Sequence, residues 1–278
     1  MVFLYGGVLD LQRIIKKFHI SFFYFITFIF SFLLLIIQFA VPVVWNYSVT
    51  FTQLAPALAV LFLAIIIKDK TAFAEIRSHI NLRFIQAKWA ILAIVVPAVC
   101  ILTTSVIMSL LEIPFNSWKG NIQFHSLNIL AILAGCFAEE IGWRGFLLPK
   151  LQKRYSPFVS SISVGVLWGV WHLNFTGGLL GFVLFTITIT EMSILMTWLY
   201  NNTKGNLILM TTWHFIFSLY SHIFLWERLN LNLFIIESIV FGIVCMVILV
   251  TNKTMFFKIP VSRMLEGTSN TDKGLHHV

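Results

Sequence analysis

Long apolar blocks separated by short polar segments dominate the chain. Eight of these blocks are about 18 to 25 residues long, and they cover residues 20–44, 51–68, 89–111, 126–149, 157–174, 179–200, 207–226 and 232–251. A helix of about 20 apolar residues spans the hydrocarbon core of a bilayer. The pattern therefore predicts an all-α fold, a polytopic transmembrane bundle of about eight helical spans.

Composition excludes the main soluble classes of protein. Of the 278 residues, 59% are hydrophobic and 11% are charged, against about 25% charged residues in an ordinary soluble domain. A soluble core stops growing at roughly 250–300 residues and could not bury so many apolar side chains. The net charge of +8 lies mainly between the apolar blocks. We therefore expect a multi-pass protein of the cell membrane, whose partner is the lipid bilayer and not nucleic acid.

The distribution of basic residues predicts the orientation of the chain. Short cytoplasmic loops carry an excess of Lys and Arg. With a cytoplasmic N-terminus and eight spans, only Lys119 and Arg228 of the 19 basic residues fall in outer segments, and only Arg144 falls within a span. Both the N-terminus and the C-terminus are therefore expected in the cytoplasm.

The loops are too short to hold a second domain. We expect one transmembrane domain over residues 1–260, with a catalytic core at about 126–226, followed by a polar C-terminal tail at 261–278. The cysteines all lie in apolar blocks, where they are expected to act as small core residues; they are Cys100, Cys136 and Cys245.

Three ionisable residues interrupt the fourth apolar block. Glu139, Glu140 and Arg144 lie within six residues of each other. An acidic or basic residue at the centre of a membrane helix costs about 2.5–3.5 kcal/mol on insertion scales, and such residues usually mark a cavity or a reaction site. The alternative is a structural ion pair that only fastens the helices together.

Helix geometry assigns different roles to the two acids. Glu140 and Arg144 are four residues apart, which places them on one face with the acid on the preferred N-terminal side. Glu139 is rotated by about 100° from Glu140. A carboxylate in a partly dehydrated cavity and outside that ion pair is the better proton acceptor. We therefore predict proton chemistry for Glu139 and a structural role for Glu140.

Two histidines in later apolar blocks extend the candidate site. His172 lies in LWGVWHLNF and His214 lies in MTTWHFIF. A single membrane histidine commonly serves as an interhelical hydrogen-bonding residue. With Glu139, however, the two imidazoles could hold one divalent metal ion such as Zn, or could position a water and stabilise an oxyanion without a metal. Both alternatives remain open from the residues.

These residues resemble the three signature regions of the CPBP family. That family contains type II CAAX prenyl endopeptidases and bacterial Abi and bacteriocin-processing or self-immunity proteins. The string EEIGWRGFL at 139–147 matches the first signature, and WGVWHL at 168–173 is similar to the second, with Trp168 in place of the usual Phe. His214 matches the start of the third. The string RGFLLPKLQKRYSP is typical of bacterial members.

The resemblance implies a glutamate-dependent intramembrane endopeptidase, also described as a metalloprotease type. Glu139 would activate water, while His172 and His214 would orient that water and stabilise the oxyanion. The third signature usually ends in Asn or Asp, but Ser218 stands there in this chain. Either Ser218 suffices, Asn174 substitutes for the missing amide, or the activity is reduced.

The leading hypothesis is hydrolysis of a peptide bond in a membrane-associated peptide or protein. The alternative is a non-catalytic protein for bacteriocin self-immunity or a membrane scaffold, which would tolerate the loss of Glu139. A transporter would also use buried acids and histidines, but it would predict paired inverted repeats. The ionisable residues cluster in the second half of the chain, which disfavours that third hypothesis.

Overall fold

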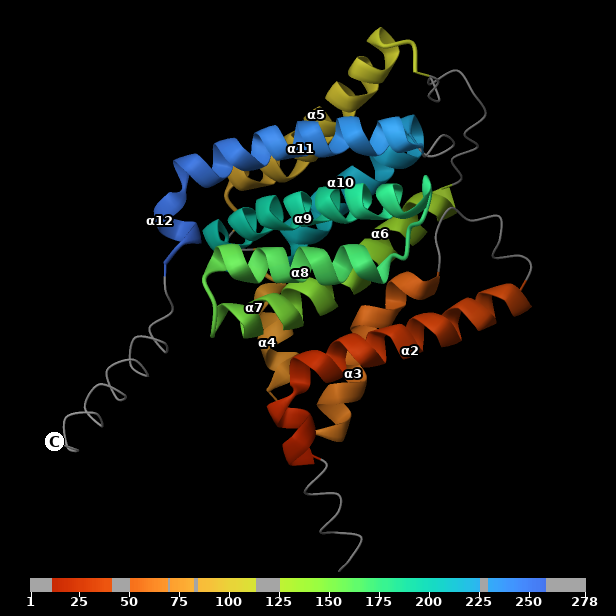
Figure 1. Cartoon of the computed structure of the whole chain (residues 1–278). Coiled ribbons are helices and arrows are strands. Elements are labelled where there is room, and N and C mark those ends of the chain that lie inside the picture. The colour runs from red at the N-terminus through yellow and green to blue at the C-terminus, as the bar shows by residue number, and fades with distance from the viewer. Residues whose placement is uncertain are drawn as a thin grey trace, which may run out of the picture. The chain divides into compact units, whose positions relative to one another are not determined.

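The computed structural model describes residues 12–41, 51–69, 71–82, 85–113, 126–225 and 230–258, and every regular element in these ranges is a helix (Figure 1). This confirms the predicted all-α fold. The elements are α2 (His19–Ala40), η2 (Phe51–Leu54), α3 (Ala55–Ile66), α4 (Ala72–His79), α5 (Ala87–Leu110), α6 (Ser126–Glu140), η3 (Ile141–Leu147), α7 (Leu148–Gln152), α8 (Pro157–Trp171), α9 (Gly178–Asn202), α10 (Leu207–Phe224), α11 (Leu231–Thr251) and α12 (Lys253–Phe256).

All eight predicted apolar blocks contain helix. Within the described ranges, five helices are both long and apolar enough to cross a bilayer: α2, α5, α9, α10 and α11. The remaining blocks form shorter helices, or, from Ser126 to Gln152, a run in which the π-helical η3 separates α6 from α7. Large apolar side chains are exposed on the spans, such as Phe32 on α2 and Leu110 on α5. A surface of this kind suits lipid, and the protein is a multi-pass membrane protein.

The count of eight spans and the cytoplasmic location of both ends stay predictions. The C-terminal tail at 261–278 lies outside the described residues, as do the outer-segment residues Lys119 and Arg228.

The chain divides into two compact units, each assembled from segments that are distant in sequence. Unit 1 comprises Met1–Phe146 and Leu199–Leu229, and unit 2 comprises Leu147–Trp198 and Asn230–Val278. The expectation of one transmembrane domain over 1–260 stays a prediction.

In unit 1, α10 packs against α5 and α6, while α2 and α6 both contact α3 and η2. Three aromatic side chains add to this packing. The ring centroid of Phe23 on α2 lies 5.6 Å from that of Trp143 and 5.1 Å from that of Phe146. Gly142 permits a close approach, since a Cβ there would overlap Pro56 at the start of α3. Helix α6 and the π-helical turn after it are thereby fixed in the core of unit 1.

In unit 2, small residues allow α8 and α9 to approach closely. A Cβ at Gly165 would lie 2.5 Å from the Cα of Thr190, and one at Gly169 would lie 2.9 Å from the Cα of Thr186. Glycines at such contacts let membrane helices pack backbone to backbone. The hydroxyl of Ser193 then donates a hydrogen bond to the buried carbonyl of Ser161 at 2.9 Å.

Candidate active site

The acids of the fourth apolar block are held inside unit 1. Glu139 and Glu140 end α6, and Arg144 lies in the π-helical turn η3. The exposed fractions of these three residues are 1%, 0% and 0%. Single π-helical turns inside α-helices are rare and occur frequently at functional sites. The charged group is therefore buried at a local irregularity of the helix.

The predicted ion pair between Glu140 and Arg144 is present. Arg144 Nη1 donates to Glu140 Oε1 at 2.9 Å, and both side chains are fully buried. The spacing prediction assumed a regular α-helix, whereas η3 has the wider π-helical turn. The pair nevertheless forms, because Glu140 is the last residue of α6 and the long guanidinium side chain spans the turn.

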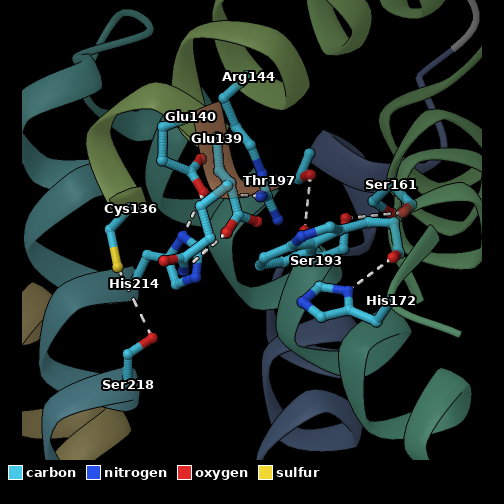
Figure 2. A network of polar contacts seen from close by, with 12 residues as sticks. Cys136, Glu139, Glu140, Arg144, Ser161, His172, Ser193, Thr197, His214 and Ser218 are labelled. Carbon is cyan, nitrogen blue, oxygen red and sulfur yellow. Dashed lines mark hydrogen bonds and ion pairs between the residues drawn. The ribbon is translucent and has the colours of Figure 1, made fainter. Parts of the chain in front are cut away.

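His214 on α10 completes a polar group around Glu140. Its Nδ1 lies 2.9 Å from the same Oε1 atom that Arg144 contacts. Figure 2 shows the side chains of His214 and Glu140 pointing toward one another. A carboxylate oxygen only accepts hydrogen bonds, so Nδ1 carries the hydrogen. In the neutral ring the lone pair is then on Nε2. One buried oxygen thus receives two donors and links α6 to α10.

Glu139 has a different partner. Its Oε1 accepts a hydrogen bond from Nε2 of Gln53 at 3.1 Å. Gln53 lies in η2, the short 3-10 turn that precedes α3. Gln53 is not among the site residues predicted from the sequence. The signal that could have found it is a lone amide at the start of an otherwise apolar block, followed within three residues by Pro56.

Ser218 lies one turn after His214 on α10, in the place where the resemblance expects Asn or Asp. Its Oγ accepts a hydrogen bond from Sγ of Cys136 at 3.7 Å. Cys136 lies one turn before Glu140 on α6. Ser218 therefore belongs to the same α6–α10 contact as His214, and its proposed role in place of the usual amide stays a prediction.

The other sequence candidates belong to unit 2. His172 follows the C-terminus of α8, and its Nδ1 lies 2.9 Å from the carbonyl of Trp168. Because a carbonyl only accepts, Nδ1 carries the hydrogen and Nε2 has the lone pair in the neutral ring. The ring also packs against those of Trp171 and Phe185, with centroids 4.9 and 5.3 Å away.

Asn174 has a local structural contact. Its Oδ1 accepts a hydrogen bond from the backbone N–H of Thr176 at 3.1 Å, a turn contact typical of Asn. The side chain thus shapes the loop between α8 and α9. The prediction that Asn174 replaces the missing amide of the third signature stays a prediction, as does the meeting of His172 with Glu139.

A metal site needs several ligand side chains close together. Among the residues that the structure describes, no group of three or more His, Cys, Asp or Glu side chains converges as metal ligands. In unit 1, the histidine nitrogen that faces the acids already contacts Glu140. Nε2 of His214 and Nε2 of His172 are not used in these contacts. The expected metal set of Glu139, His172 and His214 therefore stays a prediction.

The sequence of this chain is similar to a known protein family and to two named proteins. Residues 121–220 match the family model described as "Type II CAAX prenyl endopeptidase Rce1-like". The "CAAX prenyl protease 2" of Methanococcus maripaludis is 30% identical over a matched length of 202 residues, and the match covers 64% of this chain and 71% of that protein. The "Lysostaphin resistance protein A" of Staphylococcus haemolyticus is 27% identical over a matched length of 138 residues, and the match covers 46% of this chain and 36% of that protein. The chain belongs to the CPBP family of intramembrane proteases, with the Rce1-like type II CAAX prenyl endopeptidases.

Proposed function

We propose that this protein is an endopeptidase that hydrolyses a peptide bond of a membrane-associated peptide or protein with water activated by Glu139. The observation that supports this is the difference between the two adjacent acids. Oε1 of Glu140 accepts hydrogen bonds from a guanidinium and an imidazole, whereas Oε1 of Glu139 accepts one from the neutral amide of Gln53. The guanidinium of Arg144 is thus hydrogen-bonded to Glu140, and this supports Glu139 as the acid that takes up the proton.

In the proposed reaction, Glu139 removes a proton from a water molecule as the water oxygen attacks the carbonyl carbon of the peptide bond. The new C–O bond gives a tetrahedral intermediate with a negative oxygen. Glu139 then passes the proton to the leaving nitrogen, and the C–N bond breaks. The products are a carboxylate and an amine, and Glu139 is ready for another cycle.

The histidines orient the water and stabilise the oxyanion in this proposal. The contact of His214 Nδ1 with Glu140 fixes its ring, and the contact of His172 Nδ1 with a backbone carbonyl fixes the other. In each neutral ring Nε2 can accept a hydrogen bond from water, and in a protonated ring it can donate to an oxyanion. Rings held in this way need little reorganisation during the reaction.

The substrate class follows from the surroundings of the site. A catalytic acid buried in a membrane helix acts on a peptide that itself lies in or on the bilayer. A prenylated C-terminus would fit the name of the archaeal relative, and a peptide precursor would fit the bacterial character of the sequence.

The decisive experiment compares the peptides in membranes of cells that carry the wild-type or the Glu139→Gln protein at equal abundance. We expect a set of cleavage products that is present with the wild type and absent with Glu139→Gln. Glu237→Gln, the same substitution in unit 2, is the matched control and should retain the products. Identical peptide sets for all three proteins would overturn the proposal.

A non-catalytic immunity or scaffold protein is the second candidate. The buried network of Arg144, Glu140 and His214 supports it, because such a network fastens α6 to α10 without any chemistry. One relative is named for lysostaphin resistance. If this candidate is correct, cells with the Glu139→Gln protein should survive lysostaphin as well as cells with the wild type.

A further inference from the structure

We infer that Gln53 is a positioning residue for Glu139: the geometry points to an amide that holds the carboxylate of the base in its working orientation. This inference rests on the proposed function. Gln53 and Glu139 are separated by 86 positions in sequence, and their contact forms only when η2 packs against α6.

The first observation is the direction of the hydrogen bond. Nε2 of Gln53 donates to Oε1 of Glu139 at 3.1 Å. An ionised carboxylate has no hydrogen to donate, so the amide must present its NH2 group. Hydrogen bonds to an ionised acceptor are stronger than those between neutral groups. The contact therefore favours one orientation of the carboxylate in its charged form, which is the form that a general base requires.

The second observation is a gap in α6 that admits the amide. Gly135 lies four residues before Glu139, on the same face of the helix. A Cβ at Gly135 would lie 2.5 Å from Oε1 and 2.8 Å from Cδ of Gln53. Any larger residue at position 135 would thus displace the amide group. Helix α6 carries both the acid and the space for the residue that orients it.

The third observation is that η2 is fixed on both sides of Gln53. The N–H of Phe51 donates to Oε1 of the buried Gln38 on α2 at 2.9 Å. Pro56 packs against Gly142, beyond the acids, where no Cβ could be accommodated. The backbone that carries Gln53 is therefore anchored two residues before it and three residues after it. Such support gives an orienting side chain its accuracy.

The fourth observation concerns the other end of the amide. Oε1 of Gln53 is buried and has no hydrogen-bond partner among the described residues. An amide that served packing alone would be expected to have this acceptor satisfied, because an unpaired buried acceptor costs free energy. Beside a general base, such an acceptor can receive a hydrogen bond from water. This favours a functional rather than a purely structural role for Gln53.

The test uses the purified full-length protein and an internally quenched peptide that spans a cleavage site found in the membrane comparison. Gln53→Met keeps the approximate size of the side chain but removes the donor. We expect kcat to fall about 10- to 100-fold, since a displacement of about 1 Å at a reacting group can cost that much. KM should change less than about twofold, because Gln53 acts through the base and not on the substrate.

Gln12→Met is the matched control. Gln12 also donates from its amide within unit 1, to the carbonyl of Ile66 at 2.9 Å, at the other end of α3. The Gln12→Met variant should leave kcat unchanged. Gly135→Ala is the second variant, since it displaces the amide of Gln53 while leaving that residue in place. It should reproduce the loss of kcat in a protein that still folds.

Double substitution separates positioning from stability. In a Glu139→Gln background, Gln53→Met should cause no further loss of the residual rate, because the residue that it orients is already inactive. If Glu139→Gln is inactive and both Gln53→Met and Gly135→Ala retain the wild-type kcat, only the role of Gln53 is overturned. If no cleavage depends on Glu139, the proposed function is overturned and this inference with it. A loss of kcat in Gln12→Met equal to that in Gln53→Met would also overturn the inference.

Discussion

Both compact units place a pair of carboxyl groups on apolar helices, but the surroundings of these groups differ. In unit 1, Glu139 and Glu140 receive hydrogen bonds from an amide, a guanidinium and an imidazole. In unit 2, Glu191 on α9 and Glu237 on α11 form no ion pair within 4 Å in the described part of the chain. Both pairs thus lie on apolar helices, with Glu191 half-buried, whereas the donors to a carboxylate that the described residues provide surround the first pair.

The difference shows why the acids of α6 are the better candidates for chemistry. A negative charge is costly in an apolar environment unless donors compensate it. The donors around Glu139 and Glu140 come from η2, η3 and α10, so the tertiary structure of unit 1 assembles them. Unit 2 instead places Glu191 against Gly242, where α9 and α11 approach closely.

The largest expected effect is on activity. Glu139→Gln should lower the cleavage rate by about 10³-fold or more, because general-base catalysis supplies about 10²–10⁴-fold and the amide also loses the negative charge. Glu191→Gln should change the rate less than about twofold. Initial rates with a quenched peptide measure both. A comparable loss in the two variants would remove the distinction between the two pairs of acids.

The next effect is on stability. Arg144→Met leaves the buried carboxylate of Glu140 without its guanidinium, and breaking a buried ion pair typically costs about 3–5 kcal/mol. The free energy of unfolding in detergent micelles, measured with denaturant, should fall by about that amount.

The double variant Arg144→Met with Glu140→Leu sharpens this test. It should recover part of the lost stability, because replacing both members of a buried pair by apolar residues is often nearly neutral. The recovery is partial because Nδ1 of His214 loses its acceptor on Glu140. A single Arg144→Met variant as stable as the wild type would contradict a structural role for the ion pair.

A smaller effect distinguishes two glycines. A Cβ at Gly142 would overlap Pro56, whose backbone is also only 3.1 Å away, whereas a Cβ at Gly242 would lie 2.9 Å from Oε1 of Glu191. The carboxylate of Glu191 can rotate away, but Pro56 cannot move without its helix. Gly142→Ala should therefore cost about 1–3 kcal/mol of unfolding free energy. Gly242→Ala should cost less than about 1 kcal/mol, because alanine favours the helix and offsets the contact. Equal losses would show that the two close approaches are equally rigid.

The smallest effect is expected for Glu237→Gln. No described ion pair is broken, so the unfolding free energy should change by less than about 1 kcal/mol and the cleavage rate should not change. Thermal unfolding and the peptide assay check these expectations. A large loss of activity would show that the acids of unit 2 also take part in the reaction.

The sequence predicted the helical segments well because the signal is local. Each apolar block is long enough to require helix in a bilayer, where backbone groups must be satisfied within the segment. The spacing of four residues likewise predicted the pair of Glu140 and Arg144. The π-helical turn at Ile141–Leu147 could not be predicted, since it depends on contacts of η3 with other elements, such as that of Gly142 with Pro56.

The residues that contact the acids were harder to predict from the sequence. His214 was found as a polar residue in an apolar block, but its pairing with Glu140 was not predicted. Gln53 was missed entirely. Periodicity reports which residues of one helix share a face, and it carries no information about which residue of another helix lies opposite.

The amino-acid sequence by itself determined that this protein is a membrane helix bundle and that Glu139, Glu140 and Arg144 share one short segment, because hydrophobicity and residue spacing act within a single helix. Only the tertiary structure decided that Glu140 accepts hydrogen bonds from Arg144 and His214, while Glu139 accepts one from Gln53. The reason is that a donor from another helix reaches its carboxylate only when the helices pack together. That packing depends on small residues, since Gly135 leaves room for Gln53 and Gly142 leaves room for Pro56.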